Sequence, residues 1–250
     1  GANWTELTNG LPNLASQKGR ISIDISRSNP NVLYSRYADA VGNIQGVYKT
    51  TNGGDSWTAV NSSQLTDVGF HWWFGGIFID PADENTIYNV DFEVQKSTNG
   101  GTSWTNSFTN AHVDQHALAF NASIPGEVLL GNDGGLYYSS NGGSSAVKDL
   151  KLPITQFYRM HVDAQNENKM YGGAQDNSTS RTQTGGLTDW NIIYGGDGFQ
   201  PLVDPTNTNV IYALYQYGAL GKSTNNGNSF SNATNGISGG DRKNWDTPIT

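Results

Sequence analysis

Three residues whose types and spacing suit metal chemistry stand close together in the segment HVDQHALAF (112–120). His112, Asp114 and His116 alternate with other residues, and in an extended chain this alternation places all three on one side. Two imidazoles and one carboxylate are a ligand set that suits zinc or a similar divalent cation. The sequence therefore predicts either a divalent-metal site or a set of side chains that hydrogen-bond the loops around them. No other cofactor is expected.

Carboxylates recur in short polar or Gly-rich segments between apolar runs. They are Asp39, Asp91, Glu93, Asp133, Asp176 and Asp197. Two such acids, one kept protonated by its surroundings and the other ionised, can hydrolyse a glycosidic bond. An Asp flanked by Gly can equally cap a tight turn. Both interpretations stay open from the sequence.

A run of aromatic residues occupies the segment VGFHWWFGG (68–76). Four of its rings are candidates for ligand contact, and they are His71, Trp72, Trp73 and Phe74. Aromatic faces suit the C–H surfaces of pyranose rings, so the run predicts a sugar-stacking platform at a loop tip. Packing against neighbouring loops is the alternative. Arg159, at the start of a later apolar run, is a further candidate for contact with a ligand.

The composition limits the fold that can position these residues. The chain has 250 residues, among them 31 Gly and no Cys, with 11% aromatic and 14% charged residues. Many turn formers together with many aromatics indicate an all-β protein. The net charge of −8 argues against nucleic acid as a partner, and no apolar run approaches the roughly 20 residues that span a membrane. This composition is acidic, rich in Gly and free of Cys, and it predicts a secreted or cell-surface protein of bacterial origin.

A Gly-rich motif repeats along the chain. It occurs as KTTNGGDSW (49–57), KSTNGGTSW (96–104), SSNGGSSA (139–146) and STNNGNSF (223–230), with TGGLTDW (184–190) as a degenerate copy. An Asp or Asn that closes a short apolar run recurs in step with it, at intervals of about 42 residues after a longer first interval. Those positions are Asp24, Asp80, Asn121, Asp163 and Asp204.

Each repeated unit has the pattern of four short strands joined by turns, which is typical of one blade of a β-propeller. We therefore predict an all-β fold, a propeller of four-stranded antiparallel blades that extends over 1–250. The predicted blades are 19–60, 75–108, 115–150, 154–193 and 197–234, with partial blades at 1–7 and 241–250. Because the chain starts and stops inside a unit, we expect the rest of a seven-bladed or larger propeller to lie outside it.

The motif S/T-x-N-x-G-x-S-W resembles the Asp-box, or BNR repeat, with Asn in place of the usual Asp. The box occurs in sialidases, xyloglucan-active hydrolases and sortilin-type receptors. The resemblance implies that the box caps the turn between the third and fourth strands and that its Trp packs between blades. The residues in this structural role are Asn52, Gly54, Trp57, Asn99, Gly101, Trp104, Asn141, Gly143, Asn225 and Gly227.

The same resemblance implies a function. In the xyloglucan-active family the catalytic acid and base are two Asp residues on the face opposite the box, one of them in a T-D-x-G-G loop. The segment GNDGG (131–135) resembles that loop, which implies Asp133 as one catalytic residue. Asp176, Asp197 or a residue outside this sequence would be its partner. The F/Y-R-I-P signature of sialidases is absent, so a sialidase is not expected.

We therefore expect a protein that binds or hydrolyses extracellular polysaccharide or cell-surface glycan. If it is an enzyme, it is a glycoside hydrolase with paired Asp residues. The alternative is a non-catalytic propeller that binds protein or peptide, as the resemblance to sortilin-type receptors implies.

Overall fold

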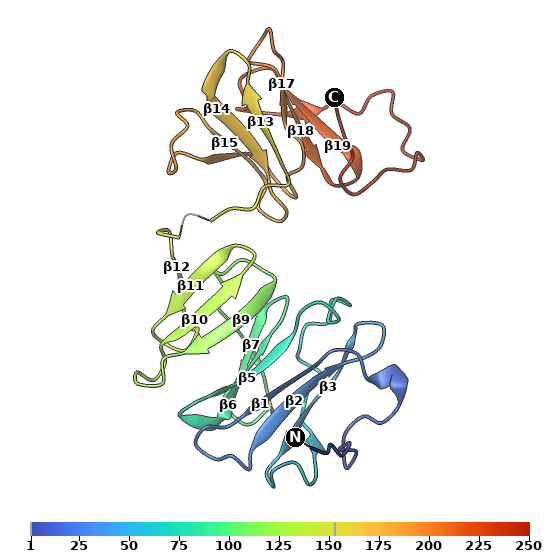
Figure 1. Cartoon of the computed structure of the whole chain (residues 1–250), viewed down its shortest axis with the longest axis vertical. Helices are drawn as coiled ribbons and strands as arrows, with labels where there is room; N and C mark the ends of the chain where they lie inside the picture. Colours follow the sequence, from blue (N-terminus) through green and yellow to red (C-terminus); the bar gives the residue numbers. More distant parts are fainter. Residues whose placement is uncertain (1, 153) are drawn as a thin grey trace. The chain divides into compact units, whose positions relative to one another are not determined.

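The computed structural model describes residues 2–152 and 154–250 and contains five four-stranded antiparallel sheets (Figure 1). Within every sheet, strands that follow one another along the chain are also neighbours in the sheet. Tight connections between antiparallel strands produce this order. The predicted all-β fold with blades of four strands is confirmed.

We call the sheets blades 1 to 5 in chain order. Blade 1 comprises β1 (Ile21–Ile25), β2 (Leu33–Ala38), β3 (Ile44–Thr50) and β4 (Thr58–Ala59). Blade 2 comprises β5 (Gly76–Asp80), β6 (Asp83–Val90), β7 (Val94–Ser97) and β8 (Thr105–Ser107). Blade 3 comprises β9 (Gln115–Phe120), β10 (Val128–Asn132), β11 (Gly135–Ser139) and β12 (Val147–Lys148).

The last two blades have the same make-up. Blade 4 comprises β13 (Arg159–Asp163), β14 (Asn166–Gly173), β15 (Thr179–Thr182) and β16 (Asn191–Tyr194). Blade 5 comprises β17 (Leu202–Val203), β18 (Ile211–Tyr215), β19 (Ala219–Ser223) and β20 (Ser231–Asn232). Two short 3₁₀ turns, η1 (Ala15–Gln17) and η2 (Gln216–Gly218), complete the elements. The predicted partial blades 1–7 and 241–250 carry no strand in the part of the chain that the structure describes.

The chain forms two compact units, Gly1–Leu152 with blades 1 to 3 and Pro153–Thr250 with blades 4 and 5. In the first unit β1 packs beside β5, and β9 packs beside β5 and β6. In the second unit β13 packs beside β17. First strands are therefore neighbours within each unit, which is how blades stack face to face in a propeller. A single continuous propeller over 1–250 stays a prediction.

Apolar side chains between successive blades form the core. The cluster between blades 1 and 2 contains Val32, Tyr34, Val47, Leu65, Ile77, Ile79, Ile87 and Trp104. Trp104 follows the box of blade 2 and is 4% exposed, yet it packs with residues of blade 1 such as Val47. Trp104 thus lies between two blades. A similar cluster joins blades 2 and 3, and a smaller one joins blades 4 and 5.

The box of blade 2 shows how these turns are closed. The side-chain oxygen of Asn99 accepts hydrogen bonds from the hydroxyl of Ser97 (2.9 Å) and from the backbone N–H of Ser103 (2.9 Å). The side-chain amide of Asn99 donates to the Ser103 hydroxyl at 2.8 Å. The backbone N–H of Gly101, whose φ is 85°, donates to the Ser97 hydroxyl at 2.9 Å. Each box therefore links the third strand of a blade to its fourth.

The same hydrogen bonds recur in three other boxes. Their Asn residues are Asn52, Asn141 and Asn225. Blade 4, which has the degenerate motif, uses Asp189 instead. Its carboxylate accepts from the hydroxyl of Thr182 at 2.6 Å and from the backbone N–H of Thr184 at 3.2 Å. These hydrogen bonds, the one from Thr182 above all, lower the pKa of Asp189.

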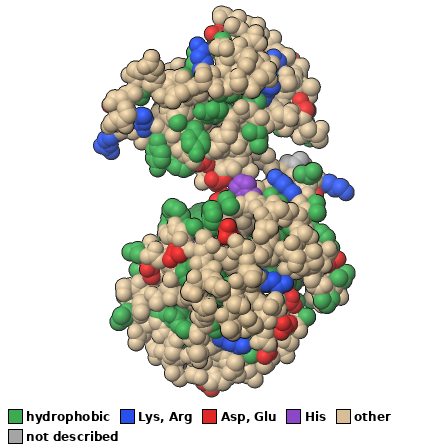
Figure 2. All heavy atoms as spheres, turned by 180° about the vertical axis from the view of Figure 1, so that it is seen from behind, with side chains coloured by type: hydrophobic (Ala, Val, Ile, Leu, Met, Phe, Trp, Pro, Cys, Tyr) green, Lys and Arg blue, Asp and Glu red, His purple; other side chains and the backbone are tan. Residues whose placement is uncertain are grey.

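The surface carries few charges. Only 14% of the residues are charged, and Figure 2 shows acidic and basic side chains scattered among neutral atoms. Within the described residues, no helix has the length and apolar character needed to cross a lipid bilayer. A ligand site is therefore to be sought among aromatic and neutral polar side chains.

We predict that Asn99→Ala lowers the free energy of unfolding by about 1–3 kcal/mol, because the Ser97 hydroxyl and the Ser103 amide lose their acceptor. Asn99→Asp is the matched control. A carboxylate still accepts both hydrogen bonds, and the Ser103 hydroxyl can rotate to donate. Urea unfolding followed by circular dichroism measures both variants. A wild-type midpoint for the alanine variant would contradict the structural role of the box.

Candidate ligand-binding site

An exposed aromatic loop precedes β5. Phe70, Trp72 and Trp73 are 57%, 58% and 62% exposed, which is unusual for such large apolar side chains. The rings of Trp72 and Trp73 meet edge to face, with centroids 6.0 Å apart and planes at 64°. We call these three residues the aromatic platform. Exposed apolar side chains gathered on one loop are typical of an interaction site.

The other two rings of the run do not face solvent. His71 is fully buried and Phe74 is 7% exposed. The loop turns at this point, since the backbone N–H of Trp73 donates to the carbonyl of Phe70 at 2.9 Å. Phe70, Trp72 and Trp73 therefore face solvent, while His71 and Phe74 are turned inward. This corrects the expectation that His71 and Phe74 contact a ligand, because both lie beneath the platform.

His71 is held by a buried polar cluster. Its Nδ1 lies 2.8 Å from the Asp91 carboxylate and 2.9 Å from the Arg36 guanidinium, and Arg36 and Asp91 form an ion pair with each other. Both partners are 1% exposed. On the other side of the ring, Nε2 lies 3.0 Å from a carboxylate oxygen of Asp67, which is 44% exposed. Burial lowers the pKa of Arg36, and the charge of Asp91 opposes that shift.

These contacts join the platform to two blades. Arg36 lies on β2 of blade 1 and Asp91 directly follows β6 of blade 2. The carboxylate of Asp91 also accepts from the backbone N–H of Phe92 at 2.8 Å. Because His71 is in hydrogen-bond distance of both side chains, its backbone position is fixed from below. The loop is thereby anchored through the interior rather than through its exposed rings.

Three further contacts hold the loop from blade 1. The guanidinium of Arg20 donates to the carbonyl of Trp73 at 2.9 Å, and the N–H of His71 donates to the carbonyl of Gly42 at 3.0 Å. Gly42 has a φ of 100°, and a Cβ there would lie 2.5 Å from the Trp72 ring. The absence of a side chain at Gly42 lets Trp72 rest on the turn between β2 and β3.

That turn is itself capped by a carboxylate. Asp39 accepts from the backbone N–H groups of Val41, Gly42 and Asn43, at 3.0, 2.7 and 2.8 Å. The hydrogen bonds from Asn43 contribute most to lowering the pKa of Asp39. Asp39 thus caps a turn, which is one of the two interpretations open from the sequence.

The predicted metal ligands are arranged differently from the expectation. The strand β9 begins only at Gln115, and Asp114 has a φ of 63°, so the extended alternation over His112–His116 is absent. His112 lies in the preceding loop, where its Nδ1 is 2.9 Å from the carbonyl of Val113. The physical reason is the left-handed backbone at Asp114, which turns the chain before the strand starts.

His116 instead pairs with Asp133. Its Nε2 lies 2.6 Å from the Asp133 carboxylate, and the two side chains are 41% and 31% exposed. Carboxylate oxygens of Asp114 and Asp133 lie within 4.8 Å of one another. In the first unit these two carboxylates lie together, and His116 contacts one of them, Asp133. The ring of Phe74 meets that of His116 with centroids 6.4 Å apart, which places this group beside the platform.

The other predicted catalytic acids belong to the second unit. Asp197 is 4% exposed, and its carboxylate accepts from the backbone N–H of Asp176 (2.7 Å) and from the side chain of Gln216. Asp176 has a φ of 56°. Asp197 therefore ties two loops together from a buried position. A catalytic pair that includes Asp133 stays a prediction.

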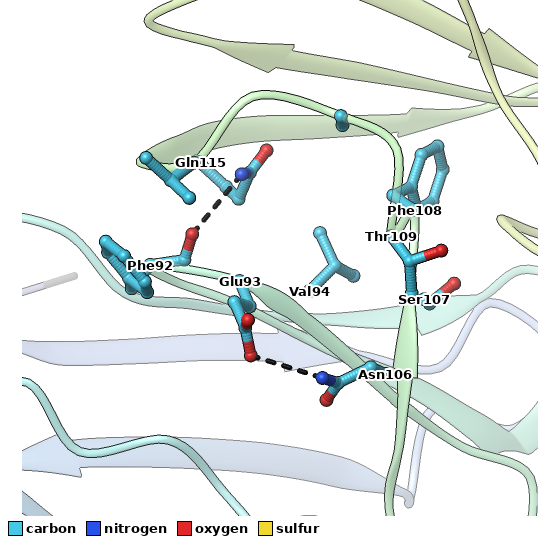
Figure 3. A pocket seen from close by; sticks show the side chains of 10 residues that line it. Phe92, Glu93, Val94, Asn106, Ser107, Phe108, Thr109 and Gln115 are labelled. Atoms are coloured by element: carbon cyan, nitrogen blue, oxygen red, sulfur yellow. Dashed lines mark hydrogen bonds between the residues drawn. The ribbon is translucent and has the colours of Figure 1, made fainter. Parts of the chain in front are cut away.

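A small pocket lies between blade 2 and the segment that leads into β9 (Figure 3). Its walls include Phe92 and Gln115, joined by a hydrogen bond of 3.3 Å, and Glu93 and Asn106, joined by another of 3.3 Å. Its volume is about 150 Å³, below the roughly 300–1,000 Å³ of most ligand sites. The aromatic platform is therefore a better candidate for ligand contact than this pocket.

We predict that Arg36→Leu lowers the free energy of unfolding by about 3–5 kcal/mol, because it leaves the Asp91 carboxylate buried without its partner. The matched control is Arg27→Leu. Arg27 is exposed, and its replacement should change stability by no more than about 0.5 kcal/mol. Chemical unfolding of both variants measures the difference. Equal stabilities would show that the buried cluster does not hold the loop.

Comparisons with known proteins identify similar folds. No protein-family model and no curated protein matches the sequence. Among solved structures, the GH74 enzyme of Niastella koreensis is 20% identical over 84% of this chain and 37% of its own, with a TM-score of 0.44. The GH74 xyloglucanase of Xanthomonas campestris is 16% identical over 84% of this chain and 38% of its own, with a TM-score of 0.41.

A third similar structure is YCF48 from Cyanidioschyzon merolae. It is 15% identical over 86% of this chain and 72% of its own, with a TM-score of 0.39. The chain thus spans less than two fifths of the length of the two GH74 structures. At these identities the similarity concerns the fold, and the structures similar to this chain are β-propellers of the Asp-box type.

Proposed function

We propose that this protein is a secreted bacterial propeller that binds a neutral extracellular polysaccharide through the aromatic platform. The observation that carries the proposal is the pair Trp72 and Trp73, two adjacent indole rings that are each more than half exposed. Indole faces pack well against the C–H surfaces of pyranose rings. A polysaccharide presents a row of such C–H surfaces. It is therefore the class of ligand that adjacent exposed indole rings suit.

The rigidity of the loop supports the same proposal. Binding to an ordered surface costs less conformational entropy than binding to a mobile one. The buried cluster beneath His71 and the hydrogen bond from Arg20 to Trp73 hold the rings in place before any ligand arrives. Rings fixed in this way suit repeated weak stacking contacts.

The charges near the platform favour a neutral ligand over an acidic one. The net charge of the chain is −8, and Asp67, which contacts His71 from the solvent side, is 44% exposed. A polyanionic glycan would meet like charge at this surface, and at low ionic strength that repulsion weakens binding. Neutral polysaccharides avoid this cost.

The proposal concerns binding and assigns no bond cleavage. The acid that best matches a catalytic position, Asp133, has a carboxylate oxygen 2.6 Å from Nε2 of His116. Hydrolysis by the whole protein is a separate question, which an assay of reducing-end release can answer. Release that disappears in Asp133→Asn would add a catalytic role to the binding role proposed here.

We expect Trp72→Ala and Trp73→Ala each to weaken binding by about tenfold, since an exposed aromatic anchor typically contributes 1–2 kcal/mol or more. Affinity electrophoresis in gels that contain xyloglucan, galactomannan or mixed-linkage β-glucan measures the effect. Gels that contain polygalacturonate test the preference for neutral chains.

The matched control is Trp4→Ala, because Trp4 is 89% exposed but lies outside the platform. Its mobility in every gel should equal that of the wild type. Wild-type retardation that both platform variants retain would overturn the proposal. The absence of retardation by any polysaccharide would favour the alternative of a protein- or peptide-binding propeller.

A further inference from the structure

The second unit carries an aromatic cluster of its own, arranged around one buried ring. Phe199 is fully buried, and Tyr158 stacks on it with centroids 5.5 Å apart and planes at 7°. Trp245 meets Phe199 edge to face at 5.8 Å and 88°, and Tyr217 meets Trp245 at 5.2 Å and 84°. Four rings from separate segments are thus organised by contacts among themselves.

The three outer rings are open to solvent. Tyr158, Tyr217 and Trp245 are 40%, 58% and 41% exposed. They come from the segment before β13, from η2 between β18 and β19, and from the segment that follows blade 5. We call them the second-unit cluster. Rings that pack on a buried floor and remain half exposed have the form of a stacking site rather than of a core.

The backbone at Tyr217 is a second, independent observation. Its φ of 56° lies in the left-handed region, which bulky residues rarely adopt. The N–H of Tyr217 donates to the carbonyl of Trp245 at 3.2 Å, and this bond helps to hold the residue in that conformation. Glycine would adopt this φ with less strain, so the tyrosine lowers the stability of the folded protein. Strain of this kind concentrates at functional sites.

Polar groups surround the rings. The hydroxyl of Tyr158 bonds to the side chain of Gln175, and the Arg159 guanidinium lies 2.9 Å from the Asp246 carboxylate. Burial raises the pKa of Tyr158, and the nearby Asp197, Asp176 and Asp246 carboxylates raise it further, so its hydroxyl stays protonated. A hydroxyl, a side-chain amide and an ion pair around aromatic faces suit the hydroxyl groups of a sugar. The acidic neighbours disfavour an anionic one.

We propose that the second-unit cluster binds neutral polysaccharide through residues of the second unit alone. Tyr158, Tyr217 and Trp245 would contact the faces of sugar rings, and Gln175 and Arg159 would contact sugar hydroxyls. Two sites on one chain, both for the same polymer, would raise its retention on that polymer beyond the affinity of either site. The site rests on the second unit alone and does not need the platform to function.

The test uses Tyr217→Gly in the full chain. The glycine relieves the left-handed backbone, so the variant should keep or raise the wild-type melting temperature while it loses one exposed ring. We expect its affinity for the neutral polysaccharide that retards the wild type to fall at least fivefold. A residue with a merely structural role would instead lower the melting temperature and leave affinity unchanged.

Two controls separate this proposal from the proposed function. Asn226→Gly relieves the same backbone conformation, at a φ of 59° in the box of blade 5, and should leave binding unchanged. The double variant Trp72→Ala/Trp73→Ala removes the platform, and its remaining retardation should disappear when Tyr217→Gly is added. Affinity electrophoresis with xyloglucan, galactomannan and mixed-linkage β-glucan supplies the readout.

The outcomes are distinct. If Tyr217→Gly binds like the wild type and the platform variant does not bind, the second site is overturned and the proposed function stands. If the platform variant binds like the wild type and Tyr217→Gly is impaired, the second site stands without the platform. A wild type that none of the three polysaccharides retards overturns both.

Discussion

The ion pair between Arg36 and Asp91 is the interaction on which the candidate site depends. Two opposite charges are buried at the meeting of blades 1 and 2, and each needs the other to offset the loss of water. The imidazole of His71 completes the group and belongs to the loop that displays Trp72 and Trp73. The same buried ion pair thus holds blades 1 and 2 together and fixes the position of the exposed rings.

Much of the fold follows from the sequence because its signals are local and repeated. Each box places an Asn, a hydroxyl and a Gly within five residues, and the structure forms the same hydrogen bonds at Asn52, Asn99, Asn141 and Asn225. Even the degenerate copy keeps its turn, because Asp189 accepts the hydroxyl and amide hydrogens instead. Short-range chemistry of this kind depends little on the rest of the chain.

The candidate sites could be predicted only in part, for physical reasons. The run HWWF identifies aromatic rings, but a turn within the loop decides that Trp72 and Trp73 face solvent while His71 does not. The alternation in HVDQH fails because Asp114 adopts a left-handed backbone, which no local pattern signals. Tyr158, Phe199 and Trp245 come together from positions far apart in the chain, so only tertiary packing unites them.

The outermost strands of the blades are short. β4, β12 and β20 have 2 residues each, whereas inner strands such as β6 and β14 have 8. A long free edge offers unpaired N–H and C=O groups to the edges of other chains, and natural sheets avoid this by shortening it. Residues that could otherwise extend the fourth strand form the box turn instead. The same turns that shape each blade therefore also leave little template for intermolecular β-pairing along its fourth strand.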